Sequence, residues 1–475
     1  MGQGRERTGM IDPIIGVSGI RGIVGESFTP EFLARFGAAF GVYLGRGRVV
    51  VGRDTRKSGE MIKHLVIGGL LASGCEVYDI GVATTPSCQI MVEEMDAAGG
   101  LVVSGSHNPE QWNALKFLGA KGLYLNRAEL TELLRGFKKW KIGTVRTEEF
   151  RPVITEMSAA QPHLSRILRL VEVQLIRSRN FKVVVDYCNG AGALITPALL
   201  RELGCEISGI NCVPNGTFLR NPEPTFVSLG DLARAVKEAG ADVGFAQDPD
   251  ADRLAVVSER GEILGEEYTL VLASWHVLSK RPGVVVTNYS TTRAMDDVAT
   301  MCRSRLVRAP VGEINVVQRM IETNAVFGGE GNGGVIDPRV HHGRDSLVGM
   351  ALILELMAES GKTVSQLMDQ LPRYYIQKEK IEFPKSKVAE ALERLRPTLK
   401  GGQISDEDGL RVDWEDGWAH IRASGTEHAV RVITEATSPE KCAELNEQMR
   451  AGFLRTLSPR RGSPRTRRRP GGARS

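Results

Sequence analysis

Short apolar runs alternate with helical stretches along most of this chain. Three Val-rich runs each end in small or polar residues, at positions 49–54, 183–188 and 284–289. Downstream of each, a second apolar run follows a helix end and leads into another loop, at positions 97–103, 241–246 and 324–327. Strands that alternate with helices predict βαβ units and mostly parallel sheets, so one such unit recurs three times.

Each loop after a second run contains a polar candidate for chemistry. The candidates are Ser106, Asp248 and Glu330. In open α/β sheets ligands bind beyond the carboxyl ends of the strands, which is where these loops are expected. A fold that repeats its active edge three times can direct three loops into one cleft.

The last part of the chain has a different pattern. It begins near Tyr374, has strand candidates at 418–421 and 430–433, and closes with a helix from Pro439 that Ser438 can cap. We therefore predict an α/β fold of three similar domains with mixed or parallel sheets, plus a smaller α+β C-terminal domain. The predicted domains are 1–155, 156–258, 259–370 and 371–457, with a disordered basic tail at 458–475.

The composition is that of a soluble globular protein, with 42% apolar and 25% charged residues among 475. A chain of this length exceeds what one hydrophobic core usually supports. No apolar run reaches the roughly 20 residues of a membrane span, and the N-terminal residues lack the apolar core of a signal peptide. The seven cysteines are scattered without a Cys-x-x-Cys pair, which favours free thiols over disulfides or a zinc site. We therefore expect a cytoplasmic protein.

The formal net charge of +4 depends on the basic tail. Residues 459–475 hold seven arginines and no acid, so the rest of the chain has a net charge of −3. A basic tail can contact nucleic acid or an anionic surface, but its Pro/Gly/Arg composition favours a solvated appendage without a catalytic role.

The sequence Leu-Val-Val-Ser-Gly-Ser-His-Asn-Pro at 101–109 places the Ser106 hydroxyl in a loop after a buried strand. A serine hydroxyl is a poor nucleophile unless a base or a metal activates it. Once phosphorylated, it carries close to −2 charge and needs a cationic site. In isolation, Ser-His-Asn-Pro would be interpreted as a polar turn before a proline.

Three aspartates, Asp248, Asp250 and Asp252, follow another apolar strand at alternate positions. Carboxylates this close repel one another, and a divalent cation such as Mg²⁺ relieves the repulsion. An EF-hand is the rival interpretation, because Glu259 falls at its twelfth position. However, Arg253 stands where an EF-hand needs glycine, and residues 254–257 have the pattern of a strand. The magnesium interpretation is favoured.

Five matches, in the expected order along the chain, resemble the α-D-phosphohexomutase family. The resemblance covers about residues 11–457. The matching segments are 19–22 together with 112–117, 101–109, 248–253, 328–334 and 422–428. The resemblance implies four domains around a central cleft, with Ser106 as the phosphoserine next to His107. It also implies catalytic roles for Arg21, for His107 and for Lys116, a general acid/base whose pKa must be lowered by the nearby metal and arginines.

The same resemblance implies the ligands of the metal and of the substrate. Mg²⁺ would be held by the three aspartates and by the phosphoserine oxygen of Ser106. Arg253 would bind the substrate, and Glu330 and Asn332 would hold the sugar hydroxyls. The non-reacting phosphate would be held by Arg422, Ser424, Gly425 and Thr426.

The chain departs from the family pattern at several positions. Asn332 replaces the serine of the sugar-binding motif Gly-Glu-x-Ser-Gly, and Gly334 stands where many relatives have histidine. His341 or His342 is a candidate to compensate for that histidine. In the other motifs, Ala114 replaces a glycine and His428 replaces a proline.

From these features we expect an isomerase that interconverts hexose or hexosamine 6-phosphate and 1-phosphate through a phosphoserine. A hexose 1,6-bisphosphate would serve as intermediate and activator. Because Glu-x-Asn-Gly resembles some hexosamine-phosphate mutases, phosphoglucosamine mutase activity is favoured, with phosphomannomutase/phosphoglucomutase as the nearest alternative. A non-catalytic sugar-phosphate-binding paralogue and a simple phosphatase are the rivals from other classes. The expected partner is a small sugar phosphate, without membrane or nucleic acid, and a homodimer is left open.

Overall fold

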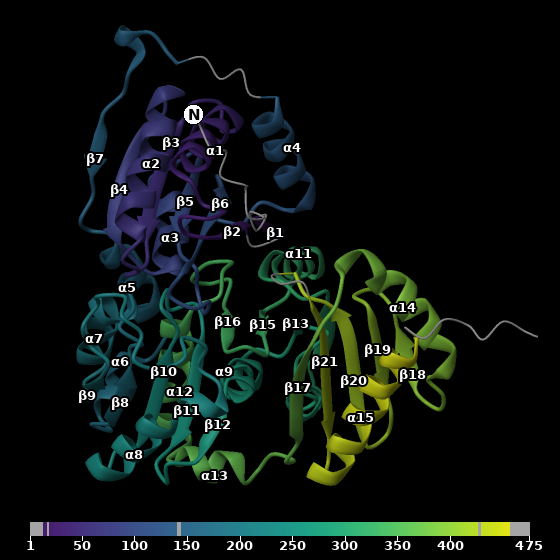
Figure 1. The fold of residues 1–475 in the computed structure, drawn as a ribbon. Coiled ribbons are helices and arrows are strands. Elements are labelled where there is room, and N and C mark those ends of the chain that lie inside the picture. The colour runs from purple at the N-terminus through teal and green to yellow at the C-terminus, as the bar shows by residue number, and fades with distance from the viewer. Residues whose placement is uncertain (1–12, 17–18, 140–143, 426–428, 457–475) are drawn as a thin grey trace, which may run out of the picture. The chain divides into compact units, whose positions relative to one another are not determined.

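The computed structural model describes residues 13–16, 19–139, 144–425 and 429–456. The chain divides into two compact units, one holding the residues up to Tyr374 together with Gly425, and the other holding the rest of the chain from Tyr375. Among the described residues, the strands form four sheets (Figure 1).

The first sheet has the strand order β1-β2-β6-β5-β3-β4-β7. Its strands are β1 (Ile14–Gly16), β2 (Gly19–Ile23), β3 (Arg48–Arg53), β4 (Glu76–Val82), β5 (Gly99–Val103), β6 (Trp112–Gly119) and β7 (Val153–Thr155). The accompanying helices are α1 (Pro30–Tyr43), α2 (Gly59–Ala72), α3 (Thr85–Glu94), α4 (Arg127–Lys138) and the 3-10 turn η1 (Thr147–Glu149). Helix α1 begins where Thr29 accepts a hydrogen bond from the backbone N–H of Phe32, and its Phe40 packs against Phe117 of β6 in the core.

The second sheet has the order β12-β11-β10-β8-β9. Its strands are β8 (Lys182–Asp186), β9 (Glu206–Ile210), β10 (Val243–Gln247), β11 (Leu254–Ser258) and β12 (Ile263–Gly265). The accompanying helices are α5 (Ala160–Leu168), α6 (Val173–Arg177), α7 (Gly192–Glu202), η2 (Phe226–Ser228) and α8 (Gly230–Ala239). Strand β10 is buried throughout, because it lies inside the sheet and is covered by helices.

The third sheet has the order β14-β13-β15-β16. Its strands are β13 (Val284–Asn288), β14 (Arg305–Ala309), β15 (Phe327–Glu330) and β16 (Gly334–Ile336). The accompanying helices are α9 (Glu267–Lys280), α10 (Ala294–Met301), α11 (Glu313–Thr323), α12 (Ser346–Ser360) and α13 (Val364–Met368). Helix α12 is buried on nearly every side, and its leucines join one continuous core with side chains of the second sheet.

The threefold repeat predicted from the apolar runs is confirmed. In each copy the first strand pairs in parallel with the second: β3 with β5, β8 with β10, and β13 with β15. The loop after the second strand then leads into an antiparallel partner, which is β6, β11 or β16. Each copy therefore presents its loop at the carboxyl end of a central strand.

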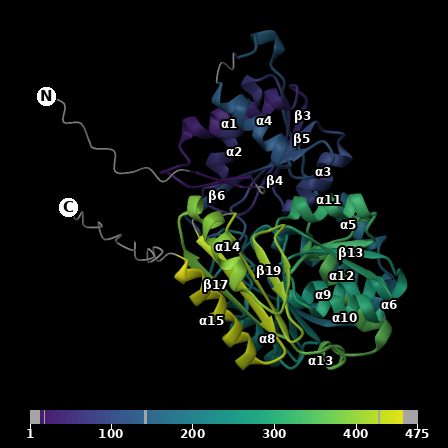
Figure 2. The same cartoon turned by 90° about the vertical axis from the view of Figure 1, so that its right-hand side faces the viewer.

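The second unit carries an antiparallel sheet of order β17-β21-β20-β19-β18. Its strands are β17 (Tyr375–Glu382), β18 (Gln403–Ser405), β19 (Leu410–Asp413), β20 (Gly417–Ala423) and β21 (Ala429–Ala436). The helices are η3 (Lys385–Lys387), α14 (Val388–Leu395), η4 (Arg396–Thr398) and α15 (Pro439–Arg455), of which α15 lies along the sheet (Figure 2). The predicted strands at 418–421 and 430–433 are present, and Ser438 caps α15 by accepting from the N–H of Lys441.

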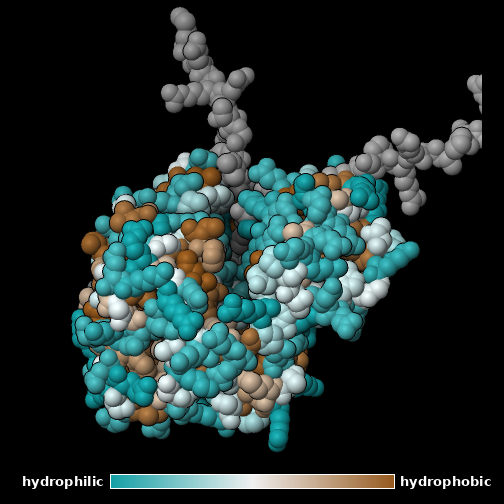
Figure 3. All heavy atoms as spheres, turned by 90° about the horizontal axis from the view of Figure 1, so that it is seen from below, coloured by the Kyte–Doolittle hydropathy of each residue, from teal (hydrophilic) through white to brown (hydrophobic). Residues whose placement is uncertain are grey.

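Three further observations concern the sequence predictions. The seven cysteines, all within the described segments, are free thiols, as predicted. Within the ranges that the structure describes, no helix is both long and apolar enough to cross a membrane. The face shown in Figure 3 is mostly hydrophilic, with apolar residues in small scattered groups. The α/β fold class with a distinct last domain is confirmed, the domain boundaries stay a prediction, and the basic tail lies outside the described residues.

Candidate active site

The loop at 104–109, here called the serine loop, holds Ser106 in a restrained backbone conformation. Ser106 has a φ of 47° and is only 2% exposed. Its backbone N–H donates to Ser104 Oγ at 2.9 Å, and its own Oγ donates to Asp248 Oδ2 at 2.9 Å. A non-glycine residue in the left-handed region costs energy and is found mainly where the surroundings impose it, often at functional sites.

The serine loop is held by Arg56, a residue that the sequence analysis did not single out. The buried Arg56 guanidinium donates to the carbonyl oxygens of Ser106 and Asn108, both at 2.6 Å, and to that of Pro109 at 2.7 Å. It is oriented by Asp54, whose carboxylate accepts from Arg56 Nε at 3.1 Å. A Cβ at Gly105 would lie 2.8 Å from this guanidinium, so only glycine fits there.

The loop at 248–253, the aspartate loop, joins β10 to β11 and buries its three carboxylates completely. One oxygen from each of Asp248, Asp250 and Asp252 lies within 4.8 Å of the others. Asp248 Oδ1 accepts from the backbone N–H groups of Asp252 and Arg253, at 3.1 and 3.2 Å. Burial, together with the charges of Asp252 and Asp250, raises the pKa of Asp248 well above its ordinary value.

The aspartate loop fits a divalent cation. Among the described residues, Asp250 Oδ1 and Asp252 Oδ1 are buried and have no hydrogen-bond partner. Two buried oxygens without donors, beside a third carboxylate, are a donor set that a hard cation satisfies. The EF-hand alternative is excluded by the fold, because β11 begins at Leu254 where an EF-hand loop would continue.

Lys116 lies on β6 with its ammonium group against the aspartate loop. Its Nζ is 2.5 Å from Asp250 Oδ2 and 3.7 Å from Asp252 Oδ2. Thr85, which the sequence analysis missed, also donates to Asp250 Oδ2. Burial by itself lowers the pKa of Lys116, but the carboxylates of Asp250 and Asp252 outweigh it, so the pKa is raised. The acidic neighbours stabilise the ammonium form, and the lowering expected from a bound metal and arginines stays a prediction.

Two further predicted residues, Arg21 and Arg253, bring positive charge to the surroundings of Ser106, and the predicted His107 lies beside its hydroxyl. Arg21 on β2 donates to Asn108 of the serine loop, and burial with the nearby Arg253 charge lowers its pKa to about 10. His107 Nδ1 is 3.4 Å from Ser106 Oγ. Burial and the charges of Arg253 and Arg21 hold the pKa of His107 well below its ordinary value. Such clustered cations favour a phosphate over a further cation.

The loop at 328–334, the glutamate loop, holds Glu330 with fixed donors. Glu330 Oε1 accepts from Asn288 Nδ2 at 2.9 Å and from the backbone N–H of Gly312 at 2.8 Å. Its Oε2 accepts from Asn332 Nδ2 at a longer 3.4 Å and lies 3.2 Å from Arg344 Nη1. Burial raises the pKa of Glu330, but Arg344 and these hydrogen bonds outweigh it, so the pKa is lowered and Glu330 stays a carboxylate.

The two histidines proposed to compensate for Gly334 lie after β16, and that role stays a prediction. His341 Nε2 lies 3.1 Å from Asp345 Oδ2. The pKa of the half-buried His342 is lowered by burial and by the neighbouring His341 charge. The space beside Gly334 is filled by Arg344, because a Cβ at Gly334 would lie 2.2 Å from Arg344 Cδ.

The predicted phosphate-holding segment begins at the end of β20 and continues beyond it. Arg422 Nη1 donates to the carbonyl of Ala423 at 3.1 Å, and the backbone N–H of Ser424 donates to the carbonyl of Ala429 at 2.8 Å. Gly425 is exposed, and Thr426 lies outside the described residues.

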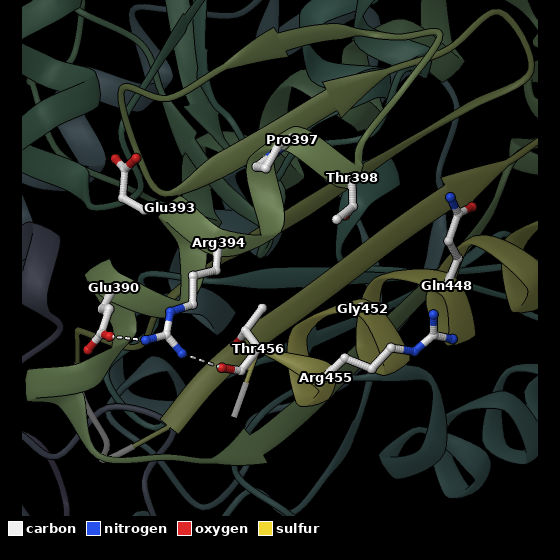
Figure 4. A pocket seen from close by; sticks show the side chains of 9 residues that line it. All are labelled: Glu390, Glu393, Arg394, Pro397, Thr398, Gln448, Gly452, Arg455 and Thr456. Carbon is white, nitrogen blue, oxygen red and sulfur yellow. Dashed lines mark hydrogen bonds and ion pairs between the residues drawn. The ribbon is translucent and has the colours of Figure 1, made fainter. Parts of the chain in front are cut away.

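A pocket within the second unit contains none of the predicted site residues. It has a volume of about 630 Å³ and lies between α14, η4 and α15 (Figure 4). In this pocket the Arg394 guanidinium donates hydrogen bonds to the Glu390 carboxylate and to the carbonyl of Thr456.

The structure thus brings the serine, aspartate and glutamate loops together within the first unit. Arg344 links two of them, because its Nη2 donates to Asp252 Oδ2 at 2.6 Å while its Nη1 pairs with Glu330. Sequence reasoning missed Arg56, Thr85 and Arg344, since lone arginines and threonines usually lie at the solvated surface. The only available signal was position in the chain: Arg56 follows the first Val-rich run, and Thr85 is the first residue of α3.

Comparisons with known proteins agree with this arrangement along most of the chain. The four models of phosphoglucomutase/phosphomannomutase match in order: alpha/beta/alpha domain I at 12–142, domain II at 161–261, domain III at 265–375 and the C-terminal domain at 379–452. A "Phosphoglucomutase/phosphomannomutase" of Thermococcus kodakarensis is 41% identical, over 91% of this chain and 97% of its own. A "Probable phosphoglucosamine mutase" of Methanopyrus kandleri is 37% identical, over 91% of this chain and 96% of its own.

A solved structure shows the same fold. It is a phosphoglucomutase/phosphomannomutase family protein of Burkholderia thailandensis, with a TM-score of 0.82 and 26% identity, covering 93% of this chain and 97% of its own. The ordered domains, the relatives and the shared fold together place this chain in the phosphoglucomutase/phosphomannomutase family, as a phosphohexomutase and therefore an isomerase.

Proposed function

We propose that Ser106 carries the phosphoryl group that this phosphohexomutase transfers. The observation that carries the proposal is the hydrogen bond from Ser106 Oγ to Asp248, in a buried site surrounded by Arg21, Arg253 and Lys116. A phosphoserine at this position would find the cationic surroundings that its charge requires.

The proposed reaction has two balanced transfers. In the first, the bond from phosphorus to Ser106 Oγ breaks and a bond to a sugar hydroxyl forms, which gives a hexose 1,6-bisphosphate. The hydroxyl proton passes to a base and Ser106 Oγ receives one. The bisphosphate then reorients in the site, and its other phosphoryl group is transferred to Ser106 Oγ. In this second transfer the bond from phosphorus to the sugar oxygen breaks and the bond to Ser106 Oγ forms. We assign the acid and base roles to Lys116 and His107, and phosphate contacts to Arg21.

We infer that the cation is Mg²⁺, held by Asp248, Asp250, Asp252 and a phosphoserine oxygen of Ser106. The unpartnered oxygens of Asp250 and Asp252 support this assignment. A bound Mg²⁺ neutralises charge on the transferred phosphoryl oxygens. Arg253, whose Nη1 donates to Glu223 at 2.8 Å, is proposed to bind the substrate.

The proposed sugar contacts are Glu330 and Asn332 of the glutamate loop. The non-reacting phosphate is assigned to Arg422, Ser424, Gly425 and Thr426. Among hexose phosphates we propose glucosamine 6-phosphate as the preferred substrate, supported by the Glu-x-Asn-Gly sequence and by relatives that carry the name phosphoglucosamine mutase. The 41% identity to a phosphoglucomutase/phosphomannomutase favours a neutral hexose as the second candidate. A cytoplasmic location and a homodimer stay predictions.

The test compares the wild type, Ser106→Ala and a control, Ser178→Ala, whose exposed hydroxyl only donates to the carbonyl of Leu175. Each is assayed with Mg²⁺ and a bisphosphate primer on glucosamine 6-phosphate, mannose 1-phosphate and glucose 1-phosphate. We expect isomerisation by the wild type and the control, and none by Ser106→Ala. Mass spectrometry should locate the phosphate on Ser106.

Three outcomes would contradict the proposal. Full activity of Ser106→Ala would show that the phosphoryl group is not transferred through Ser106. Hydrolysis without isomerisation would indicate a phosphatase. Binding without turnover in the wild type would indicate a non-catalytic paralogue.

A further inference from the structure

Arg344 is a buried cation shared among three carboxylates from different elements. It lies between β16 and α12, and its side chain is 8% exposed. Its Nη2 donates to Asp252 Oδ2 at 2.6 Å, and its Nε donates to Glu313 Oε2 at 2.9 Å. Its Nη1 lies 3.2 Å from Glu330 Oε2. One planar guanidinium therefore contacts the aspartate loop, the start of α11 and the glutamate loop.

The backbone that carries Arg344 is fixed by its neighbour Asp345. Asp345 Oδ1 caps α12 by accepting from the N–H groups of Leu347 and Val348. Its Oδ2 lies 2.7 Å from His163 Nε2 and 3.1 Å from His341 Nε2. A fully buried carboxylate with this many partners leaves the preceding residue little freedom.

Arg344 also fills the volume that a side chain at position 334 would need. A Cβ built on Gly334 would lie 2.2 Å from Arg344 Cδ and 2.7 Å from its Cγ. The Arg344 side chain therefore occupies the space that a side chain at position 334 would need. Glu330 pairs directly with Gly334 across the β15–β16 hairpin, so the arginine reaches the carboxylate from the side that this glycine leaves open.

We propose that Arg344 is a positioning residue for sugar recognition: it holds Glu330 Oε2 toward the sugar and couples the glutamate loop to the aspartate loop. This inference rests on the proposed function, in which Glu330 binds sugar hydroxyls. The other oxygen of Glu330 is already held by Asn288 and Gly312, so Arg344 sets the direction of the remaining oxygen. A lysine could supply the charge but not the three-way fork.

The kinetic test uses the wild type, Arg344→Gln, Arg344→Lys and the control Arg339→Gln. Arg339 lies on the same connection but pairs only with Asp337 among the described residues, through a more exposed side chain. The value of kcat/KM is measured on glucosamine 6-phosphate and on its 3-deoxy and 4-deoxy analogues. If Glu330 is correctly oriented, loss of the hydroxyl that it binds should lower kcat/KM by about 10- to 100-fold in the wild type.

We expect this penalty to be unchanged in Arg339→Gln and to fall to within about threefold in Arg344→Gln, with an intermediate value in Arg344→Lys. An unchanged penalty in Arg344→Gln, whether or not activity falls on all three substrates, would overturn the proposal and leave only a packing role. Absence of turnover in the wild type would instead contradict the proposed function.

The packing of Arg344 against Gly334 can be tested by thermal unfolding, without an activity assay. Gly334→His should clash with Arg344 and lower the thermal unfolding midpoint, and Arg344→Gly should recover much of that loss in the double variant. An unchanged midpoint for Gly334→His, or no recovery in the double variant, would show that the two positions do not share one space.

Discussion

The aspartate loop and the glutamate loop occupy equivalent places in two copies of the repeat, yet their carboxylates differ in how far the protein satisfies them. In the aspartate loop, Asp250 and Asp252 each keep one buried oxygen without a hydrogen-bond partner. In the glutamate loop, both oxygens of Glu330 have partners, of which those to Oε2 are the longer. The same strand–loop–strand unit therefore leaves carboxylate oxygens without hydrogen-bond partners in one copy and supplies those partners in the other.

The difference shows how one backbone design can serve two ligand classes. A buried oxygen without a donor is unfavourable until a strong positive charge meets it, so the aspartate loop suits a cation. A carboxylate with all its donors is stable alone and can exchange one loose partner for a neutral hydroxyl, so the glutamate loop suits a sugar. Arg344 joins the two loops while leaving Asp252 Oδ1 open.

Among substitutions in the aspartate and glutamate loops, the largest effect should come from Asp250→Asn. The substitution removes one charge of the metal site and the partner of Lys116, and we expect kcat to fall about 10³-fold. In the wild type, Mg²⁺ at 100 times its dissociation constant should stabilise the folded protein by about 2.7 kcal/mol. Thermal unfolding with and without Mg²⁺ should show this stabilisation lost in Asp250→Asn. It should persist in Asp231→Asn, a change at an exposed residue of α8. A Mg²⁺-dependent shift that survives Asp250→Asn would place the cation elsewhere.

Glu330→Gln should separate the two loops. The amide oxygen can still accept from Gly312 and Asn288, but an NH₂ group replaces the oxygen beside Arg344. We expect kcat/KM to fall by about 10- to 100-fold, because a buried guanidinium faces a donor and a sugar hydroxyl loses its acceptor. The stabilisation by Mg²⁺ should be unchanged, and Glu322→Gln, on the exposed side of α11, should match the wild type. If Glu330→Gln also abolished the Mg²⁺ effect, the division between a cation loop and a sugar loop would fail.

The fold and the site differ in how far the sequence predicts them. The strands and the α15 cap follow from local patterns, because a buried strand needs a run of apolar residues and Ser438 caps within three residues. The loops that bear Ser106, Asp248 and Glu330 follow from strand ends in the same way. Arg56 and Arg344 do not, because their partners lie 50 and 92 residues away in the chain, at Ser106 and Asp252. Only tertiary packing shows that these arginines are buried, and without it their charge indicates the surface.

The pKa of Lys116 shows a second limit of sequence reasoning. The role of general acid/base suggested a lowered pKa, from a cation and arginines nearby. In the structure the closest charges are the carboxylates of Asp250 and Asp252, and they raise it. The direction of a shift depends on which charge is nearest, and residues 134 apart in the chain, such as Lys116 and Asp250, become neighbours only in the folded protein.

The smallest effect should come from Asn332→Ser, which introduces the serine found at this position in the family's sugar-binding motif. Asn332 is half-buried, its Nδ2 contact with Glu330 is long at 3.4 Å, and its Oδ1 accepts from the N–H of Gly334 at 3.2 Å. The folding free energy should therefore change by no more than about 0.5 kcal/mol. Because the shorter serine cannot reach the same atoms, the ratio of kcat/KM for glucosamine 6-phosphate to that for glucose 1-phosphate should fall by about fivefold, which corresponds to ~1 kcal/mol. The ratio is its own control, since a general loss of activity cancels in it. An unchanged ratio would mean that Asn332 does not distinguish the sugars, and selectivity would then have to come from Glu330 as Arg344 holds it.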